Sequence, residues 1–207
     1  MVRKTKEDAE LTRKKIINAA RAVFLTRGVS KSTLEHIATQ ANVTRGAVYW
    51  HFKNKTEIFH AIREQVFLPL IDRMDDTLAI SADNSQNPLD QIEASLCHTI
   101  QELNNNLEMR EIYEIMMIKC EYVDEFALVL HQIMNNCSSI VEKIEAAYAR
   151  AHSLNLLAST LRPRALALDT HLFFGGLLHM WVKDADGSQF RFQAMNLIKS
   201  HINLRRK

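Results

Sequence analysis

The sequence predicts an all-α protein, and three observations support that fold class. Residues that interrupt helices are scarce, with only five Gly and three Pro among 207 residues. No run of alternating β-branched residues, the pattern typical of strands, occurs in the chain, whereas apolar residues recur at helical spacing. A composition of 47% hydrophobic and 24% charged residues is ordinary for a soluble globular protein, and this length is sufficient to bury a core.

The first two helices are predicted from residue spacing and capping residues. One helix is expected over residues 10–27, where apolar side chains share a face and Gly28 follows as a left-handed stop. A second helix is expected over residues 33–40. The sequence S-T-L-E at residues 32–35 predicts a capping box at its start, with Ser32 as the N-cap.

The third helix is expected to follow Thr44 as its N-cap and to end near Phe52. The helical pattern is interrupted at residues 41–43, where Asn42 is the best substitute for glycine in a left-handed turn. Two short helices joined by a three-residue turn predict a helix-turn-helix.

A fourth and longer helix is expected to begin at the capping sequence of residues 54–57, and Pro69 should kink it or end it near Leu68. Asn87 followed by Pro88 predicts the start of the next helix. Further helices are expected at residues 88–105, 108–119, 124–152, 163–182 and 188–203, which gives about nine in all.

Charge is distributed unevenly between the two predicted domains, residues 1–55 and 56–207. The net charge is +2, but residues 1–60 hold 12 Lys and Arg against 5 Asp and Glu, whereas residues 61–207 hold 14 against 19. A basic N-terminal domain is where a polyanion would bind. The alternative is that these charges form an ordinary solvated helix face.

The stretch T-R-G-A-V-Y-W-H-F-K-N-K, residues 44–55, separates by face when it is placed on a helical wheel. Val48 and Phe52 lie on one side with Ala47. The opposite side carries an arginine, a glycine, a tyrosine and a tryptophan, which are Arg45, Gly46, Tyr49 and Trp50. A helix that served only as core would bury all of its rings, so this pattern favours a surface for recognition.

The second helix of a helix-turn-helix lies in the major groove of DNA. Arg45 can then bind a guanine edge or a phosphate, and Gly46 lets the helix backbone approach closely. Tyr49 offers a hydroxyl to phosphate and a ring edge to thymine methyls. His51 and Lys55 are placed for phosphate contacts at the start of the fourth helix.

Enzymatic use of His51 is the alternative, and the sequence disfavours it. The neighbouring residues supply no acid or nucleophile except Glu57, and no G-x-S-x-G, H-E-x-x-H, phosphate-binding glycine loop or paired-carboxylate motif occurs in the chain. We therefore expect no catalytic residue and no cofactor. The cysteines Cys97, Cys120 and Cys137 form no C-x-x-C pair, so neither a disulfide framework nor a metal site is expected.

The N-terminus is charged where a signal peptide would be apolar, and no apolar run is expected to reach the roughly 18 residues that span a bilayer. These features and the cysteine pattern predict a cytoplasmic protein without a membrane partner.

Several stretches match a known family. They are R-K-T-K-E near the start, T-R-K-K-I-I-N-A-A-R-A-V-F in the first helix, S-T-L-x-x-I-A and above all T-R-G-A-V-Y-W-H-F-K-N-K, with I-K-C-E-Y and G-L-L-H-M-W in the larger domain. With these motifs the chain resembles the TetR family of one-component transcriptional repressors, and in detail the AcrR-type branch that controls multidrug efflux pumps.

The resemblance implies a nine-helix subunit that dimerises through its last two helices and binds a palindromic double-stranded operator. The DNA-contact positions that it implies are Thr33, Thr44, Arg45, Gly46, Tyr49, Trp50, His51 and Lys55. The family usually has glycine where this chain has Asn42, and asparagine can adopt the same conformation.

The resemblance also implies a pocket for a small lipophilic ligand, such as a drug, a dye or a plant aromatic compound, in the larger domain. Met, Phe and Tyr suit such ligands because they bury area and adapt. The residues expected to line the pocket are Phe67, Tyr113, Met117, Cys137, His171 and Phe174. Each has an alternative role as an ordinary core residue, and Gly175 stands where relatives carry an acidic ligand contact.

Two adjacent glycines, Gly175 and Gly176, lie within a predicted helix, where each costs about 1 kcal/mol relative to alanine. Helix packing across a two-fold axis would explain them, and tight packing inside one subunit is the alternative. The residues expected at this homodimer seam are Leu172, Gly176, His179 and Met180.

The predicted function is therefore that of a ligand-responsive repressor of efflux-pump genes. An activator or a global regulator is an alternative within the same class. An enzyme with an accessory DNA-binding domain would need a catalytic constellation in the larger domain, and an architectural DNA binder would leave that domain without a role.

Overall fold

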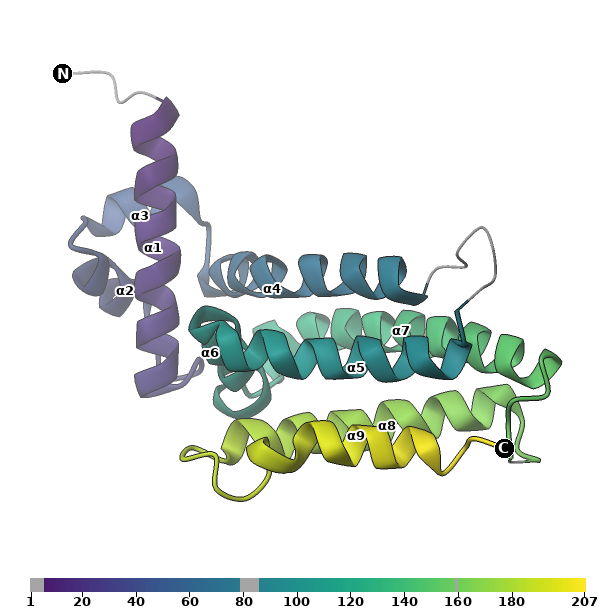
Figure 1. The fold of residues 1–207 in the computed structure, drawn as a ribbon. Coiled ribbons are helices and arrows are strands. Elements are labelled where there is room, and N and C mark those ends of the chain that lie inside the picture. Colours follow the sequence, from purple (N-terminus) through teal and green to yellow (C-terminus); the bar gives the residue numbers. More distant parts are fainter. Residues whose placement is uncertain (1–5, 79–85, 159) are drawn as a thin grey trace. The chain divides into compact units, whose positions relative to one another are not determined.

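The computed structural model describes residues 6–78, 86–158 and 160–207, and for residues 66–77 it describes the backbone alone. Within these ranges all regular elements are helices, which confirms the predicted all-α fold. The nine α-helices of the described ranges are α1 (Lys6–Arg27), α2 (Leu34–Ala41), α3 (Arg45–His51), α4 (Lys55–Leu78), α5 (Pro88–Asn105), α6 (Leu107–Glu114), α7 (Ala127–Ser153), α8 (Pro163–Lys183) and α9 (Ala194–Asn203) (Figure 1). Three short elements accompany them, the π-helix η1 (Ile115–Lys119) and the 3₁₀-helices η2 (Asp124–Phe126) and η3 (Arg191–Gln193).

The predicted N-cap of α2 is wrong. The capping box of α2 begins at Thr33 instead of Ser32, and its second member is His36: Thr33 Oγ1 accepts from the His36 N–H, and His36 Nδ1 accepts from the Thr33 N–H. Ser32 is instead buried and donates to the Gly28 carbonyl at 2.6 Å. The α4 helix continues past Pro69 to Leu78, which excludes an end near Leu68, one of the two predicted outcomes, because a proline removes only one hydrogen bond of the helix and the bonds on either side remain.

The chain divides into two compact units. Unit 1 comprises the described residues of Met1–Phe67 together with Glu108–Leu130. Unit 2 comprises the described residues of Leu68–Leu107 together with His131–Lys207.

Unit 1 joins the predicted DNA-binding helices to the segment that contains α6, η1 and η2. Its core includes the fully or almost fully buried side chains of Ile16, Phe24, Ile37, Val48, Phe52, Ile58 and Phe59. Arg21 on α1 forms ion pairs with Glu108 and Glu111 on α6. The Val29 N–H, just after α1, donates to the Lys119 carbonyl at 2.8 Å. The π-helix is therefore bonded directly to the loop between α1 and α2.

Unit 2 contains α5, α8, α9 and most of α7, and a buried polar network fixes three of them. The Tyr148 hydroxyl on α7 lies 2.8 Å from Thr170 Oγ1 on α8, which also lies 3.3 Å from His201 Nε2 on α9. The His201 ring stacks on Phe173 with 3.8 Å between the ring centroids. These contacts hold α9 against α8 by directed bonds as well as by apolar packing.

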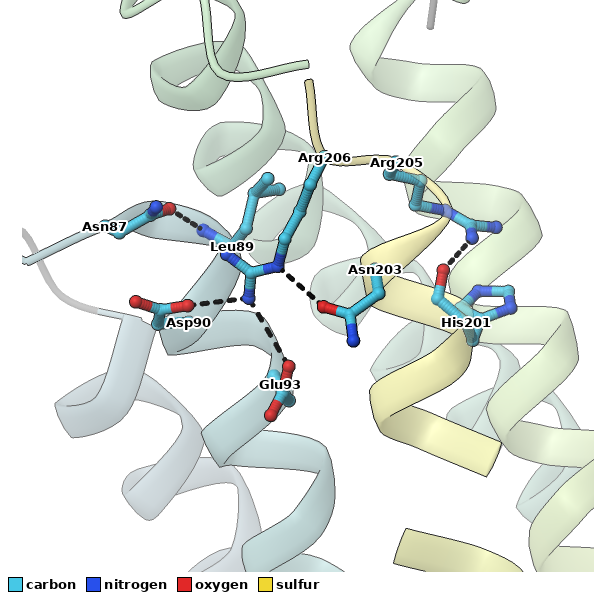
Figure 2. A network of polar contacts seen from close by, with 8 residues as sticks. All are labelled: Asn87, Leu89, Asp90, Glu93, His201, Asn203, Arg205 and Arg206. Atoms are coloured by element: carbon cyan, nitrogen blue, oxygen red, sulfur yellow. Dashed lines mark hydrogen bonds and ion pairs between the residues drawn. The ribbon is translucent and has the colours of Figure 1, made fainter. Parts of the chain in front are cut away.

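The three residues Arg205, Arg206 and Lys207, which lie just after α9, bond it to neighbouring elements, including α5. Figure 2 shows the Arg206 guanidinium between Asp90 and Glu93 of α5, at 2.6 and 3.3 Å, with a further bond to Asn203. Figure 2 also shows the bond from Arg205 to the His201 carbonyl, and Arg205 pairs in addition with Asp169 on α8. The backbone N–H of Lys207 donates to the Leu156 carbonyl at 3.0 Å.

Among the described residues, α8 is long and apolar enough to cross a membrane by length and composition alone, with a mean hydropathy of 1.2 in its most apolar window. The prediction that no apolar run reaches this length is therefore wrong for α8. The core helix of a soluble protein passes the same test, and Trp181, Thr170 and Ala167 of this helix are completely buried in unit 2.

Candidate functional site

The α3 helix presents two different faces, as its sequence predicted. Val48 and Phe52 are 0% and 2% exposed and pack into unit 1, whereas Tyr49 and Trp50 are 47% and 71% exposed. Arg45 is exposed on the same side as these two rings. A folded protein exposes two large aromatic side chains beside an arginine at an energetic cost unless a partner covers them.

Backbone geometry sets the angle between α2 and α3. Asn42 adopts φ 53° and ψ 46°, so the predicted left-handed turn is confirmed, and its N–H donates to the last carbonyls of α2. Thr44 caps α3, because its Oγ1 accepts from the Ala47 N–H at 3.1 Å. In Thr33 and Thr44 the oxygen accepts a capping bond, which leaves the hydroxyl hydrogen able to donate to a phosphate oxygen.

Arg45 and Tyr49 form a pair on the outer face of α3. The Arg45 guanidinium donates to the Tyr49 hydroxyl at 3.2 Å and lies 5.4 Å from the centre of its ring. This hydrogen bond raises the pKa of Arg45, and the nearby Glu35 on α2 acts in the same direction. The arginine is thus oriented by a neighbour one helical turn away and stays charged.

The remaining predicted DNA contacts differ in how accessible they are. Thr33, Thr44 and Gly46 are exposed, and His51 is half-buried with its ring against the Trp50 ring, 4.5 Å between centroids. Lys55 is different, because its side chain is only 15% exposed and its ammonium already has partners inside unit 1. It donates to the Ser30 carbonyl at 3.2 Å and lies 3.5 Å from a Glu125 carboxylate oxygen.

Three residues near this surface were missed by the sequence predictions. His36 completes the cap of α2, and Glu125 holds Lys55. The Arg13 guanidinium lies 5.2 Å from the centre of the Phe52 ring and so covers the end of α3. The residue three places after the N-cap of a capping box is usually glutamate or glutamine, so the sequence gave no reason to expect His36 in this role. Arg13 and Glu125 are far from α3 in the sequence and could be found only from the fold.

The residues predicted to bind a ligand are distributed over both units. Tyr113 is buried and Met117 half-buried in unit 1, where Met117 belongs to the π-helix η1, an element that is frequent at functional sites. Cys137, His171 and Phe174 are half-buried in unit 2. The side chain of Phe67 lies outside the described residues.

Burial favours the uncharged form of two residues of this group, His171 and Cys137. Burial lowers the pKa of His171 and raises the pKa of the Cys137 thiol. Uncharged groups in a mainly apolar setting suit a lipophilic ligand. Two surface clefts of about 430 and 350 Å³ involve other residues, at the α8–η3 loop and beside Gly28, so neither corresponds to the predicted pocket.

The outer face of α8 carries the predicted dimer residues. Leu172 and Met180 are 71% and 39% exposed, Gly176 is exposed, and His179 is half-buried. Apart from their chain neighbours and the backbone of α8 itself, no described atom lies within 4 Å of a Cβ built on Gly175 or Gly176. Among the described residues, nothing supports the alternative that these glycines allow tight packing inside one subunit.

Comparisons with known proteins agree with this architecture. The family model for bacterial regulatory proteins of the tetR family matches residues 16–62, and the model for the C-terminal region of MAATS-type transcriptional repressors matches residues 87–206. The HTH-type transcriptional regulator AcrR of Shigella flexneri is 33% identical over 88% of this chain and 83% of its own length.

Solved structures of efflux-pump repressors are similar over almost the whole chain. NalD, the secondary repressor of the MexAB-OprM multidrug efflux pump in Pseudomonas aeruginosa, is 31% identical with a TM-score of 0.85, covering 98% of this chain and 99% of its own. SmeT in complex with triclosan is 29% identical with a TM-score of 0.80, covering 95% and 92%. The chain therefore belongs to the TetR family of bacterial transcriptional regulators, a non-enzymatic family, and is related to AcrR, as its sequence predicted, and its C-terminal region is that of a MAATS-type repressor.

Proposed function

We propose that this protein is a homodimeric, ligand-responsive repressor that binds a palindromic operator and controls multidrug efflux pump genes. The observation that carries the proposal is the outer face of α3, where Arg45 is oriented beside the exposed rings of Tyr49 and Trp50. The related NalD and SmeT are both repressors of multidrug efflux pumps.

In this proposal residues 1–55 form the DNA-binding domain and α3 enters the major groove. Arg45 binds a guanine edge or a phosphate, and Tyr49 and Trp50 lie against the groove wall. Gly46 lets the backbone approach the DNA. The hydroxyl and cationic groups that bind the phosphates are Thr33, Thr44, His51 and Lys55.

Two copies join through α8 and α9 in this proposal, within a regulatory domain of residues 56–207. The exposed apolar side chains Leu168, Leu172 and Met180 of α8 and Leu197 of α9 support this seam. At Gly176 the absent side chain lets a second helix backbone approach. A two-fold axis would bring each of these residues against its own copy, and the two DNA-binding domains would then meet a palindrome.

A small lipophilic ligand is the proposed effector, and the predicted contacts Phe67, Tyr113, Met117, Cys137, His171 and Phe174 are the positions at which substitutions test it. Triclosan bound to SmeT is a ligand of this chemistry. The ligand releases the operator only by binding one conformation of the dimer more tightly than the other. As a DNA-binding regulator the protein acts in the cytoplasm.

Footprinting of the DNA that flanks the gene tests this proposal, with and without a panel of lipophilic drugs and dyes. We expect protection of a palindrome that at least one compound relieves. Protection that no compound relieves would contradict the efflux-inducer role and leave the repressor role intact. Transcription from the same DNA, measured with purified polymerase, separates repression from activation, because a repressor lowers the transcript that the protected palindrome overlaps.

A further inference from the structure

The ammonium group of Lys55 is enclosed by three groups of unit 1. It donates to the Ser30 carbonyl at 3.2 Å, lies 3.5 Å from Glu125 Oε1 and is 5.5 Å from the centre of the Phe126 ring. These partners come from the loop after α1 and from η2. Lys55 thus joins the start of α4 to two segments that are distant in the sequence.

Glu125 is held in place to make this contact. Its second carboxylate oxygen accepts from the Thr56 hydroxyl at 3.3 Å, so both oxygens face the start of α4. The next residue, Phe126, is buried and its ring packs edge-on against Phe59 with 5.4 Å between the centroids. The preceding residue, Asp124, adopts φ 47°, a left-handed conformation that non-glycine residues rarely take. Packing on one side and an unusual backbone turn on the other fix the carboxylate.

A carboxylate and a phosphate oxygen are the same kind of partner for an ammonium group, because both are anionic acceptors. We propose that Glu125 competes with an operator phosphate for Lys55, so that Lys55 binds DNA only after it leaves Glu125. This inference rests on the proposed role of Lys55 as a phosphate contact. It assigns to Glu125 a function in DNA binding, although the residue belongs to η2 and is distant from α3 in the sequence.

The exchange is close to balanced in energy. The Glu125 side chain is 51% exposed, so water solvates it readily when the lysine leaves. Partly exposed ion pairs of this kind contribute little, and their loss changes an equilibrium by about two- to fivefold. Glu125 therefore lowers operator affinity by a small factor and does not prevent binding. Because the coupling is reciprocal, DNA that captures Lys55 also removes one of the contacts between η2 and α4, while Phe126 stays packed against Phe59.

A double-mutant cycle on the full-length dimer tests the inference, using the operator duplex found by footprinting. The variants are Glu125→Gln, Lys55→Gln and the two combined, and Glu121→Gln is the matched control, because Glu121 is an exposed acid on the same segment. Affinity is measured by fluorescence anisotropy at several KCl concentrations. Circular dichroism melting shows that each variant is folded.

Glu125→Gln should tighten operator binding by about two- to fivefold and leave the salt dependence unchanged, because the same phosphate contact forms in the complex. Lys55→Gln should weaken binding and reduce the slope of log K against log salt by about 0.9, the contribution of one phosphate contact. The combined variant should behave like Lys55→Gln. Glu121→Gln should behave like the parent.

Two results would overturn the inference. If Glu125→Gln tightened binding equally in the Lys55→Gln background, the carboxylate would act by general repulsion of DNA. If Glu125→Gln weakened binding, the carboxylate would position Lys55 for the phosphate instead of competing with it. Arg45→Ala separates these failures from failure of the proposed function, since only a wrong assignment of the α3 face leaves the affinity of Arg45→Ala unchanged.

A measurement without DNA gives an independent readout. Amine acetylation of the free dimer, quantified by mass spectrometry, should modify Lys55 faster in Glu125→Gln than in the parent. Equal acetylation rates of Lys55 in the two proteins would show that Glu125 does not bind its ammonium group in the free dimer.

Discussion

The outer faces of α3 and α8 expose large apolar side chains to the same extent, with Trp50 and Leu172 each 71% exposed. Their surroundings differ. Trp50 belongs to a basic segment and lies on the same face as the oriented Arg45, whereas Leu172 lies on a helix with the open positions of Gly175 and Gly176. Exposure alone therefore shows that a partner is expected, and the neighbouring residues indicate which partner it is.

Physical chemistry explains why the two faces suit different partners. Aromatic rings beside a cation offer hydrogen-bond donors, stacking surface and charge together, which fits the polar and anionic surface of DNA. Aliphatic side chains beside a glycine offer area and close backbone approach, which fits another protein helix. On this basis we propose α3 as the DNA face and α8 as the dimer face, and four substitutions test the distinction.

Leu172→Asp should give the largest effect. A carboxylate at the centre of the α8 seam would have to lose its hydration in the dimer, so we expect monomers in sedimentation velocity. Operator affinity should then fall by about 10²- to 10⁴-fold, since one DNA-binding domain no longer assists the other. Leu128→Asp is the control, because Leu128 is a similarly exposed leucine on α7. If Leu172→Asp remained a dimer with the operator affinity of the parent, the dimer interface would have to lie on another surface.

Arg45→Ala should weaken operator binding by about 5- to 100-fold, the range for one base or phosphate contact, and leave the dimer intact. The side chain is exposed, so the thermal midpoint should stay within a degree or two of the parent. Arg27→Ala, an exposed arginine at the end of α1, serves as the control. Equal affinity for Arg45→Ala and the parent in anisotropy titrations would reject α3 as the DNA face.

Tyr49→Phe keeps the ring and removes the hydroxyl that accepts from Arg45. The loss of one hydrogen bond should reduce operator affinity by about two- to tenfold. If the hydroxyl acts by orienting Arg45, the substitution should have no further effect in an Arg45→Ala background. Additive effects of the two substitutions would mean that the Tyr49 hydroxyl binds DNA independently of Arg45.

His201→Gln should give the smallest effect on DNA binding. It alters the hydrogen-bond network of Tyr148, Thr170 and His201 in unit 2 and leaves α3 unchanged. Burial and then the charge of Arg205 lower the pKa of His201 to about 4, against about 6.5 in the unfolded chain. Between about pH 4 and 6.5, His201 is protonated in the unfolded chain and neutral in the folded protein. The free energy of unfolding therefore falls as the pH decreases from about 6.5 towards 4.

Urea unfolding at pH 7, 6 and 5 measures this dependence. The parent should lose more stability than His201→Gln over that range, and the operator affinity of the folded dimer at pH 7 should be the same for both. Parallel losses in the two proteins would show that other groups, and not His201, cause the acid sensitivity of unit 2.

Local signals in the sequence predicted much of this fold. The faces of α3 follow from helical periodicity, the Asn42 turn from the conformational preference of asparagine, and the start of α5 from Asn87 and Pro88. These features depend on residues within one or two helical turns of each other. The continuation of α4 through Pro69 depends instead on the helical hydrogen bonds on either side of the proline. A rule that considers the proline alone does not take those bonds into account.

The site was predictable to a smaller degree for a similar reason. The pairing of Arg45 with Tyr49 lies within one turn of α3 and could have been found from their spacing. The contact between Lys55 and Glu125 joins residues whose proximity exists only in the folded unit. The identity of the α2 cap was wrong because Ser32 and Thr33 are chemically alike, and packing of Ser32 beneath the Gly28 carbonyl decides between them.

The bond from the Val29 N–H to the Lys119 carbonyl has a consequence for mutational screens. It joins two backbones, so alanine scanning of Val29 and Lys119 leaves it in place and would assign no importance to this junction. Gly28, with φ 77°, is the neighbouring position at which any side chain is strained. Variants that lose regulation while keeping every side chain of α3 and α8 should therefore be sought among changes of backbone, such as proline at position 29.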